Sequence, residues 1–233
     1  MHSSDATVVP TPHHPKLAHH FDNLEQQKEA STLGMWIFLV NEIMFFGGMF
    51  TAYLVYRHRY FDAFAAGSNT LDLWAGAINT AILIGSSLTV VLAVYAAQMG
   101  RRRSLILWLV LTMVLGAAFL GIKAYEYAHK FEEHHVPGPS FHIEPNDPHF
   151  KGVDPQRAQL YFSLYFAMTG MHALHMIIGL GVFSWLTWNA YKGRFTVEYH
   201  SPVEIGGLYW HFVDIVWIFL FPLLYLISRH PTH

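Results

Sequence analysis

Hydrophobic residues gather into five long blocks, and most polar residues lie between them. The blocks are Leu33–Tyr56, Leu73–Ala97, Ser104–Ala124, Leu160–Trp188 and Gly206–Ile227. Each has about 20 residues or more, enough for a helix rising ~1.5 Å per residue to cross a hydrocarbon core ~30 Å thick. Core helices of soluble proteins usually keep a polar face over such a length. The pattern therefore predicts an all-α fold: an integral membrane bundle of five transmembrane helices.

The polar segments set the domain organisation. Residues 1–31 contain no apolar run and are predicted to be a polar cytoplasmic tail, not a secretory signal. Residues 32–233 then form one membrane domain. Its longest connection, 125–159, is rich in proline, histidine and acidic residues. This loop is too short to build its own core, so we expect an extramembrane cap.

Basic residues predict the orientation in the membrane. Arg101, Arg102 and Arg103 lie on a short link between the second and third blocks, which must form a tight antiparallel hairpin. Short cytoplasmic loops of membrane proteins carry an excess of Lys and Arg. The link is therefore expected in the cytoplasm with the N-terminus, and the C-terminus outside.

Small residues recur at every fourth position of the second block. Spacing of four keeps them near one helix face, and small side chains let another helix backbone approach closely in a membrane. This pattern predicts a helix-packing seam. Its members are Ala77, Ala81, Gly85, Thr89, Ala93 and Ala97.

Composition narrows the chemistry. The chain is 53% hydrophobic and only 13% charged, with a formal net charge of −2, so nothing indicates a nucleic-acid partner. It contains no cysteine, which excludes disulfides, thiolate metal sites and CxxCH haem attachment. No motif of a catalytic site is present, and we expect no catalytic, cofactor-binding or metal residue in this chain.

A few polar residues lie inside the predicted helices, where a charge costs at least ~2.5–3.5 kcal/mol. At ~1.5 Å per residue they converge at one depth, toward the cytoplasmic side. Pairs three residues apart share a helix face. The set is Glu42, His172, His175, His211 and Asp214, with Trp210 beside His211.

Three interpretations of these residues stay open. They can form hydrogen bonds that hold the helices together, each bond contributing ~0.6–2 kcal/mol to stability. They can line a cleft that holds lipid or water and supports proton uptake in a partner. They can also ligate haem or metal, with His211 opposite a histidine of the fourth block. Elsewhere, Lys123 and Glu126 are expected to pair at the membrane interface. The histidines His13, His14, His19, His20, His134 and His135 are expected to be solvated.

Motifs on all five blocks resemble one family, in order along the chain. They are Leu33-Gly34-Met35-Trp36-Ile37-Phe38-Leu39-Val40-Asn41-Glu42, Asn79-Thr80-Ala81-Ile82-Leu83 with Ser86-Ser87, Leu115-Gly116 to Tyr125-Glu126-Tyr127, Thr169-Gly170-Met171-His172-Ala173-Leu174-His175, and Leu208-Tyr209-Trp210-His211-Phe212-Val213-Asp214-Ile215-Val216-Trp217. The chain resembles subunit III of cytochrome c oxidases within the haem-copper oxidases, in the five-helix bacterial form. Glu42 matches the family's buried helix glutamate.

The resemblance implies a non-redox core subunit of a translocase in the bacterial plasma membrane. Such a subunit binds beside subunit I, holds phospholipid in a cleft and supports proton uptake from the cytoplasm. Haem and copper are then expected in partner subunits I and II. Subunit IV is a further partner where the complex has one, and a supercomplex with a cytochrome c reductase is compatible with the family.

This sequence lacks the first two helices of the seven-helix mitochondrial form, so a neighbouring subunit is needed to complete the usual two-bundle cleft. Two rivals share the five-helix form, namely subunit III of a quinol oxidase and a nitric-oxide-reductase accessory protein. The Asn79-Thr80 segment favours the cytochrome c branch. A free-standing di-haem membrane cytochrome is the rival from another class.

Overall fold

The computed structural model describes residues 20–132, 136–138, 141–143, 148 and 150–227. Within these residues the chain forms six helices and no strand. The helices are α1 (Leu24–Arg59), α2 (Phe61–Asn69), α3 (Leu73–Gln98), α4 (Arg102–Glu132), α5 (Pro155–Tyr191) and α6 (Ser201–Tyr225).

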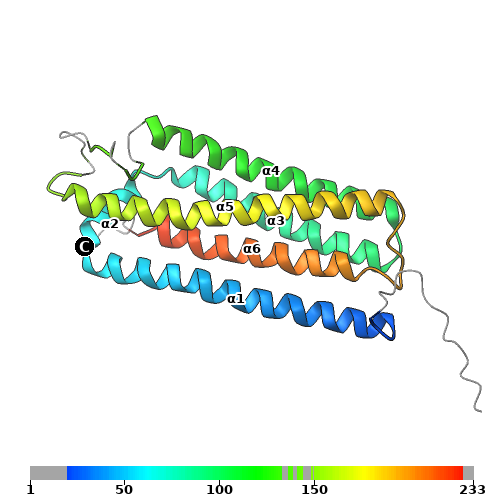
Figure 1. Cartoon of the computed structure of the whole chain (residues 1–233). Helices are drawn as coiled ribbons and strands as arrows, with labels where there is room; N and C mark the ends of the chain where they lie inside the picture. The colour runs from blue at the N-terminus through cyan, green and yellow to red at the C-terminus, as the bar shows by residue number, and fades with distance from the viewer. Residues whose placement is uncertain (1–19, 133–135, 139–140, 144–147, 149, 228–233) are drawn as a thin grey trace, which may run out of the picture.

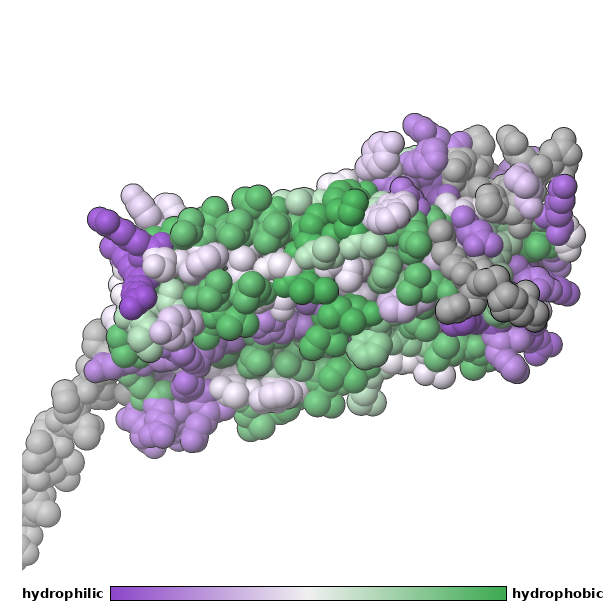
Figure 2. Space-filling model, turned by 180° about the vertical axis from the view of Figure 1, so that it is seen from behind, coloured by the Kyte–Doolittle hydropathy of each residue, from purple (hydrophilic) through white to green (hydrophobic). Residues whose placement is uncertain are grey.

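Five of these helices, α1 and α3 to α6, are long and apolar enough to cross a membrane. The predicted all-α bundle of five transmembrane helices is therefore confirmed. Figure 2 shows the corresponding surface, with hydrophobic residues across the middle of one face and hydrophilic residues gathered at both ends. We call the end where α1 begins the N-terminal end of the bundle, and the end where α6 finishes the C-terminal end.

Helices α3, α4, α5 and α6 form a closed four-helix unit in which each helix contacts two neighbours. Helix α1 lies outside this unit (Figure 1), against α6 and α5, and within the described residues it contacts neither α3 nor α4. Only 11% of the most apolar stretch of α1 is buried, against 56% for α6. Most of α1 therefore faces whatever surrounds this chain.

Several helices extend beyond the predicted blocks. Helix α1 begins at Leu24, inside the predicted tail, because Asn23 accepts a hydrogen bond from the Gln26 backbone N–H and caps the helix. Helix α4 continues to Glu132, and α5 begins at Pro155 behind the cap residue Asp154. Only the two ends of the expected loop 125–159 are therefore helical, leaving 133–154 as the connection. Hydropathy marks the apolar span only, whereas capped helices continue into water.

The C-terminal end of α6 is held by tyrosines of other helices. The last four carbonyls of a helix have no partner within it. Here Tyr53 of α1 donates to the Leu223 carbonyl at 2.7 Å, and Tyr161 of α5 donates to the Leu224 carbonyl at 3.2 Å. These bonds connect α1 and α5 to the end of α6, which packing of apolar side chains alone would not position.

The predicted small-residue seam of α3 is only partly right. Thr89, Ala93 and Ala97 are buried, and Thr89 bonds Thr112 of α4 through their hydroxyls at 2.7 Å. Ala81 is exposed, and Ala77 and Gly85 are only half-buried. A step of four residues advances about 400° at 3.6 residues per turn, so such a stripe winds around the helix instead of staying on one face.

A close approach of the helices of the four-helix unit centres on Trp210 instead. A Cβ built at Gly116 of α4 would lie 2.7 Å from the Trp210 ring, and one at Gly179 of α5 would lie 3.0 Å from it. The indole N–H donates to Ser86 of α3 at 3.0 Å. Trp210 therefore joins all four helices of the unit and has a packing role.

Candidate functional site

The polar side chains inside the bundle fall into two groups. The residues predicted from the sequence, which we call the histidine layer, are Glu42, His172, His175, His211 and Asp214. A second group, the lysine cluster, lies nearer the C-terminal end and consists of Lys123, Glu126, Tyr165 and Tyr225. The histidine layer is spread over three places, whereas the lysine cluster is one connected network.

Glu42 and His175 form the first place, where α1 meets α5. The Glu42 Oε2 lies 3.2 Å from the His175 Nε2, and the side chains are 16% and 11% exposed. The Nδ1 of His175 lies 2.9 Å from the Met171 carbonyl. A carbonyl can only accept, so Nδ1 carries a hydrogen. The contact between Nε2 and Glu42 is an ion pair when the imidazole is protonated.

The Glu42–His175 pair places two ionisable groups side by side where α1 meets α5. It lines a shallow depression on the surface of the bundle with Asn41, Met44 and Met171. The pair is therefore reachable from outside the chain. Chemically, a carboxyl group and an imidazole can each take up or release a proton.

His172 forms the second place, in the interior of the four-helix unit. It is 1% exposed, and neither ring nitrogen has a hydrogen-bond partner in the described residues. Its ring packs between Phe119 of α4 and Trp217 of α6, with centroid distances of 5.5 and 5.2 Å. The side chain behaves here as an aromatic core residue and makes no bond to His175.

His211 and Asp214 form the third place, on a groove between α3 and α6. The Nδ1 of His211 lies 2.7 Å from the Ser87 hydroxyl. His211 and Asp214 share a helix face but make no bond to each other, since neither carboxylate oxygen of Asp214 has a hydrogen-bond partner of good geometry in the described residues. The histidine layer therefore contains one ion pair between helices, one packed ring and one carboxylate without a well-formed hydrogen bond.

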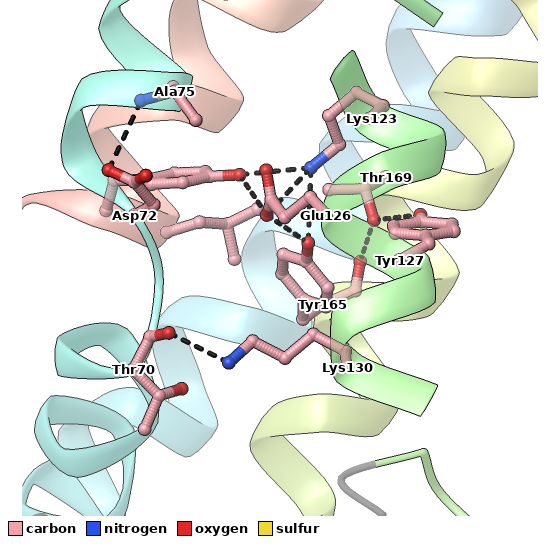
Figure 3. A network of polar contacts seen from close by, with 12 residues as sticks. Thr70, Asp72, Ala75, Lys123, Glu126, Tyr127, Lys130, Tyr165 and Thr169 are labelled. Atoms are coloured by element: carbon pink, nitrogen blue, oxygen red, sulfur yellow. Dashed lines mark hydrogen bonds and ion pairs between the residues drawn. The ribbon is translucent and has the colours of Figure 1, made fainter. Parts of the chain in front are cut away.

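The lysine cluster joins α4, α5 and α6 (Figure 3). The Lys123 ammonium donates to Glu126 Oε1 at 3.1 Å, to Tyr165 at 3.1 Å and to Tyr225 at 3.0 Å. The hydroxyls of Tyr165 and Tyr225 donate in turn to Glu126 Oε1, at 2.5 and 2.6 Å. Beside it, the Tyr127 and Thr169 hydroxyls lie 2.5 Å apart.

The expected pairing of Lys123 with Glu126 is confirmed, whereas its expected depth at the membrane interface stays a prediction. Lys123 is 4% exposed and Glu126 is 7% exposed, so the pair lies in the protein interior. The rings of Tyr127, Tyr165, Tyr225 and Trp217 surround the ammonium at 5.2–5.6 Å. The ring quadrupoles and hydroxyls replace water around the charge.

Sequence reasoning missed Tyr165 and Tyr225 because they lie on other helices, 39 and 99 residues from Glu126. A signal was nevertheless present. A lysine in an apolar block must find partners inside the bundle, and tyrosine is a common donor there.

Metal binding finds no support within the described part of the chain, where no three His, Asp or Glu side chains stand close enough to hold an ion. Of the clustered histidines noted in the sequence, His20 is described, whereas His13, His14, His19, His134 and His135 lie outside the described residues.

Comparison with known proteins identifies relatives along nearly the whole chain. A family model described as cytochrome c oxidase subunit III matches residues 18–141 and 156–229. Cytochrome c oxidase subunit 3 of Thermostichus vulcanus is 30% identical over 209 residues, which cover 89% of this chain and 92% of that protein. The probable quinol oxidase subunit 3 of Staphylococcus haemolyticus is 31% identical over 209 residues, covering 89% and 94%.

Proposed function

We propose that this chain, which belongs to the cytochrome c oxidase subunit III family, is a non-redox core subunit of a proton-pumping haem-copper terminal oxidase in aerobic respiration. It would stabilise subunit I, bind phospholipid and support proton uptake. Partner subunits I and II would carry haem and copper, and subunit IV and a cytochrome c reductase are further candidate partners. Its place would be the bacterial plasma membrane, N-terminus inside.

The observation that carries this proposal is the Glu42–His175 pair. The pair brings an ionisable carboxyl and an ionisable imidazole within 3.2 Å of each other and is reachable from outside the chain. A proton-uptake aid needs both properties, because it must exchange protons without losing its structure. A purely structural pair would need neither.

A lipid role is supported by an apolar groove between α1 and α6. Its lining is apolar apart from His211, and includes Trp36, Phe50 and Phe219. A long surface of this kind suits an acyl chain. It exists because α1 stands apart from the four-helix unit and leaves a gap along α6.

The non-redox role is supported by how the histidines are used. An axial haem ligand needs a free ring nitrogen facing a haem-sized space. The His175 nitrogens bond Glu42 and Met171, and the His172 ring lies between Phe119 and Trp217. The visible spectrum of the isolated chain tests this point, since a Soret band would contradict it.

The electron donor separates cytochrome c oxidase from the alternatives, a quinol oxidase subunit III and a nitric-oxide-reductase accessory protein. We propose the cytochrome c branch on the Asn79-Thr80 segment, although relatives with both oxidase names match at similar identity. The test is the purified complex, which should oxidise reduced cytochrome c. Oxidation of quinol alone would select the alternative.

The proton role is tested by Glu42→Gln in the whole oxidase. Glutamine keeps the size and one hydrogen bond to His175 but cannot ionise. We expect the complex to assemble and start at nearly normal rate, and then to lose activity during turnover several-fold faster than wild type. Activity against number of turnovers is the measurement.

Tyr127→Phe is the matched control, because it removes one buried hydrogen bond, to Thr169, in the half of the bundle away from Glu42. The control should keep the wild-type turnover lifetime. If Glu42→Gln keeps it as well, with unchanged lipid content and proton uptake, Glu42 is structural and the proposed role fails.

A further inference from the structure

Asp214 lies in a groove on the outer surface of the bundle, between α3 and α6. The lining of the groove is apolar except for three residues that lie together on it, Ser87, His211 and Asp214. The apolar members are Leu83, Ile84, Leu88, Val91, Ile215 and Ile218. Neither the packing of the four-helix unit nor the proposed proton role uses this surface.

Asp214 is the unusual member of the groove. It is 3% exposed, and neither carboxylate oxygen makes a hydrogen bond of good geometry among the described residues, although the Ser87 side chain lies near it. An unpaired polar group buried away from water costs roughly 2–7 kcal/mol, depending on the reference state. Something outside this chain is therefore expected to satisfy the carboxyl group.

The depth of Asp214 limits what that partner can be. It lies 13 residues after Ser201 and 11 before Tyr225 on α6, roughly 20 Å and 17 Å from the two helix ends at 1.5 Å per residue. The headgroups lie ~15 Å from the centre of a hydrocarbon core ~30 Å thick. A lipid headgroup therefore cannot reach Asp214, and an acyl chain offers no hydrogen bond.

The walls of the groove fit a helix. Leu88 on α3 is 61% exposed, and Ile215 and Ile218 on α6 are 51% and 44% exposed. His211, which uses one ring nitrogen for Ser87, adds a second polar group to the same surface. Apolar walls around a polar centre match a transmembrane helix that carries one hydrogen-bonding side chain at mid-membrane depth.

We propose that this groove seats a transmembrane helix of a neighbouring oxidase subunit, which places a hydrogen-bonding side chain against Asp214. The inference rests on the proposed function, because only a complex provides such a helix. It adds the contact surface on this chain and the chemistry of the residue that occupies it.

Photo-crosslinking in the intact oxidase tests the proposal directly. A photoreactive phenylalanine analogue at Leu88 should join this chain to another oxidase subunit. The matched control is Leu107 of α4, which is also 61% exposed but does not line the groove. We expect several-fold more subunit-to-subunit product from Leu88 than from Leu107.

Two substitutions test the role of the carboxyl group. Asp214→Asn keeps a hydrogen-bonding side chain and should stay with the complex through detergent purification. Asp214→Leu removes it and should be lost several-fold more readily. Products with lipid alone at Leu88, a yield no higher than at Leu107, or wild-type retention of Asp214→Leu would each overturn the proposal.

The same preparation separates this inference from the proposed function. If no haem-copper subunit copurifies with the wild-type chain, the proposed function fails. If the subunits copurify but Leu88 reaches only lipid, the proposed function stands and the contact surface fails.

Discussion

The two charged pairs inside this bundle differ in their surroundings. Glu42 and His175 meet at the edge, where α1 joins the four-helix unit, and each keeps more than a tenth of its side chain exposed. Lys123 and Glu126 lie inside the unit, with two tyrosine hydroxyls on the carboxylate and four aromatic rings around the ammonium. The enclosed pair is fixed in place, whereas the open pair can exchange protons and partners.

The comparison indicates that the contacts which stabilise this membrane bundle lie in a different part of it from the polar pair that is open to the outside. Apolar burial does not drive helix association in lipid, so close packing and polar contacts must hold the helices. In this chain those contacts concentrate in the four-helix unit, at Trp210 and the lysine cluster. Helix α1 has few of them, and its polar pair remains available for other roles.

The largest expected effect comes from Lys123→Met, which leaves the Glu126 carboxylate without its cation. Removing one partner of a buried ion pair typically costs about 3–5 kcal/mol. We expect a loss of this size in the free energy of unfolding of the full chain, measured by SDS titration in mixed micelles. Adding Glu126→Gln should recover most of it, because glutamine still accepts from Tyr165 and Tyr225.

The control is Lys28→Met, which breaks an ion pair of 2.9 Å to Glu204 in which the lysine side chain is 46% exposed. Exposed pairs contribute about 0–1 kcal/mol. Equal costs for Lys28→Met and Lys123→Met would show that the enclosure of the lysine cluster has no energetic consequence.

An intermediate effect is expected from Gly116→Ala. The added methyl would lie 2.7 Å from the Trp210 ring and 3.3 Å from Leu180. Inserting a methyl into a tight core typically costs about 1–3 kcal/mol. Gly121→Ala on the same helix is the control, since nothing lies within 4 Å of its added Cβ. The two variants should separate clearly in the same titration.

The sequence predicted the helices well because the thickness of a bilayer fixes their length. Four of the five blocks lie inside an observed helix, and the fifth ends two residues beyond one. The helix ends were missed where capping decides them, as at Asn23 and Asp154. Hydropathy carries no information on such local hydrogen bonds, and α2 was likewise too short and amphipathic to stand out.

The sequence predicted which residues belong to the candidate site better than it predicted the contacts between them. Glu42, His172 and Asp214 were identified because a polar group in an apolar block is costly. Which of them meet depends on the rotation of each helix about its axis. Spacing along one helix cannot give that rotation, which is why the Glu42–His175 pair formed and the His211–Asp214 pair did not.

The smallest expected effect on stability comes from Glu42→Gln, the variant proposed above as a functional test. Hydrogen bonds between transmembrane helices average about 0.6 kcal/mol, and glutamine keeps one bond to His175. The free energy of unfolding should therefore change by less than that, although we expect the same variant to lose activity faster during turnover. A stability loss matching that of Lys123→Met would place Glu42 with the structural pairs, and the division between the two pairs would then disappear. A stable variant with a short turnover lifetime would establish that the open pair is retained for its proton and not for its strength.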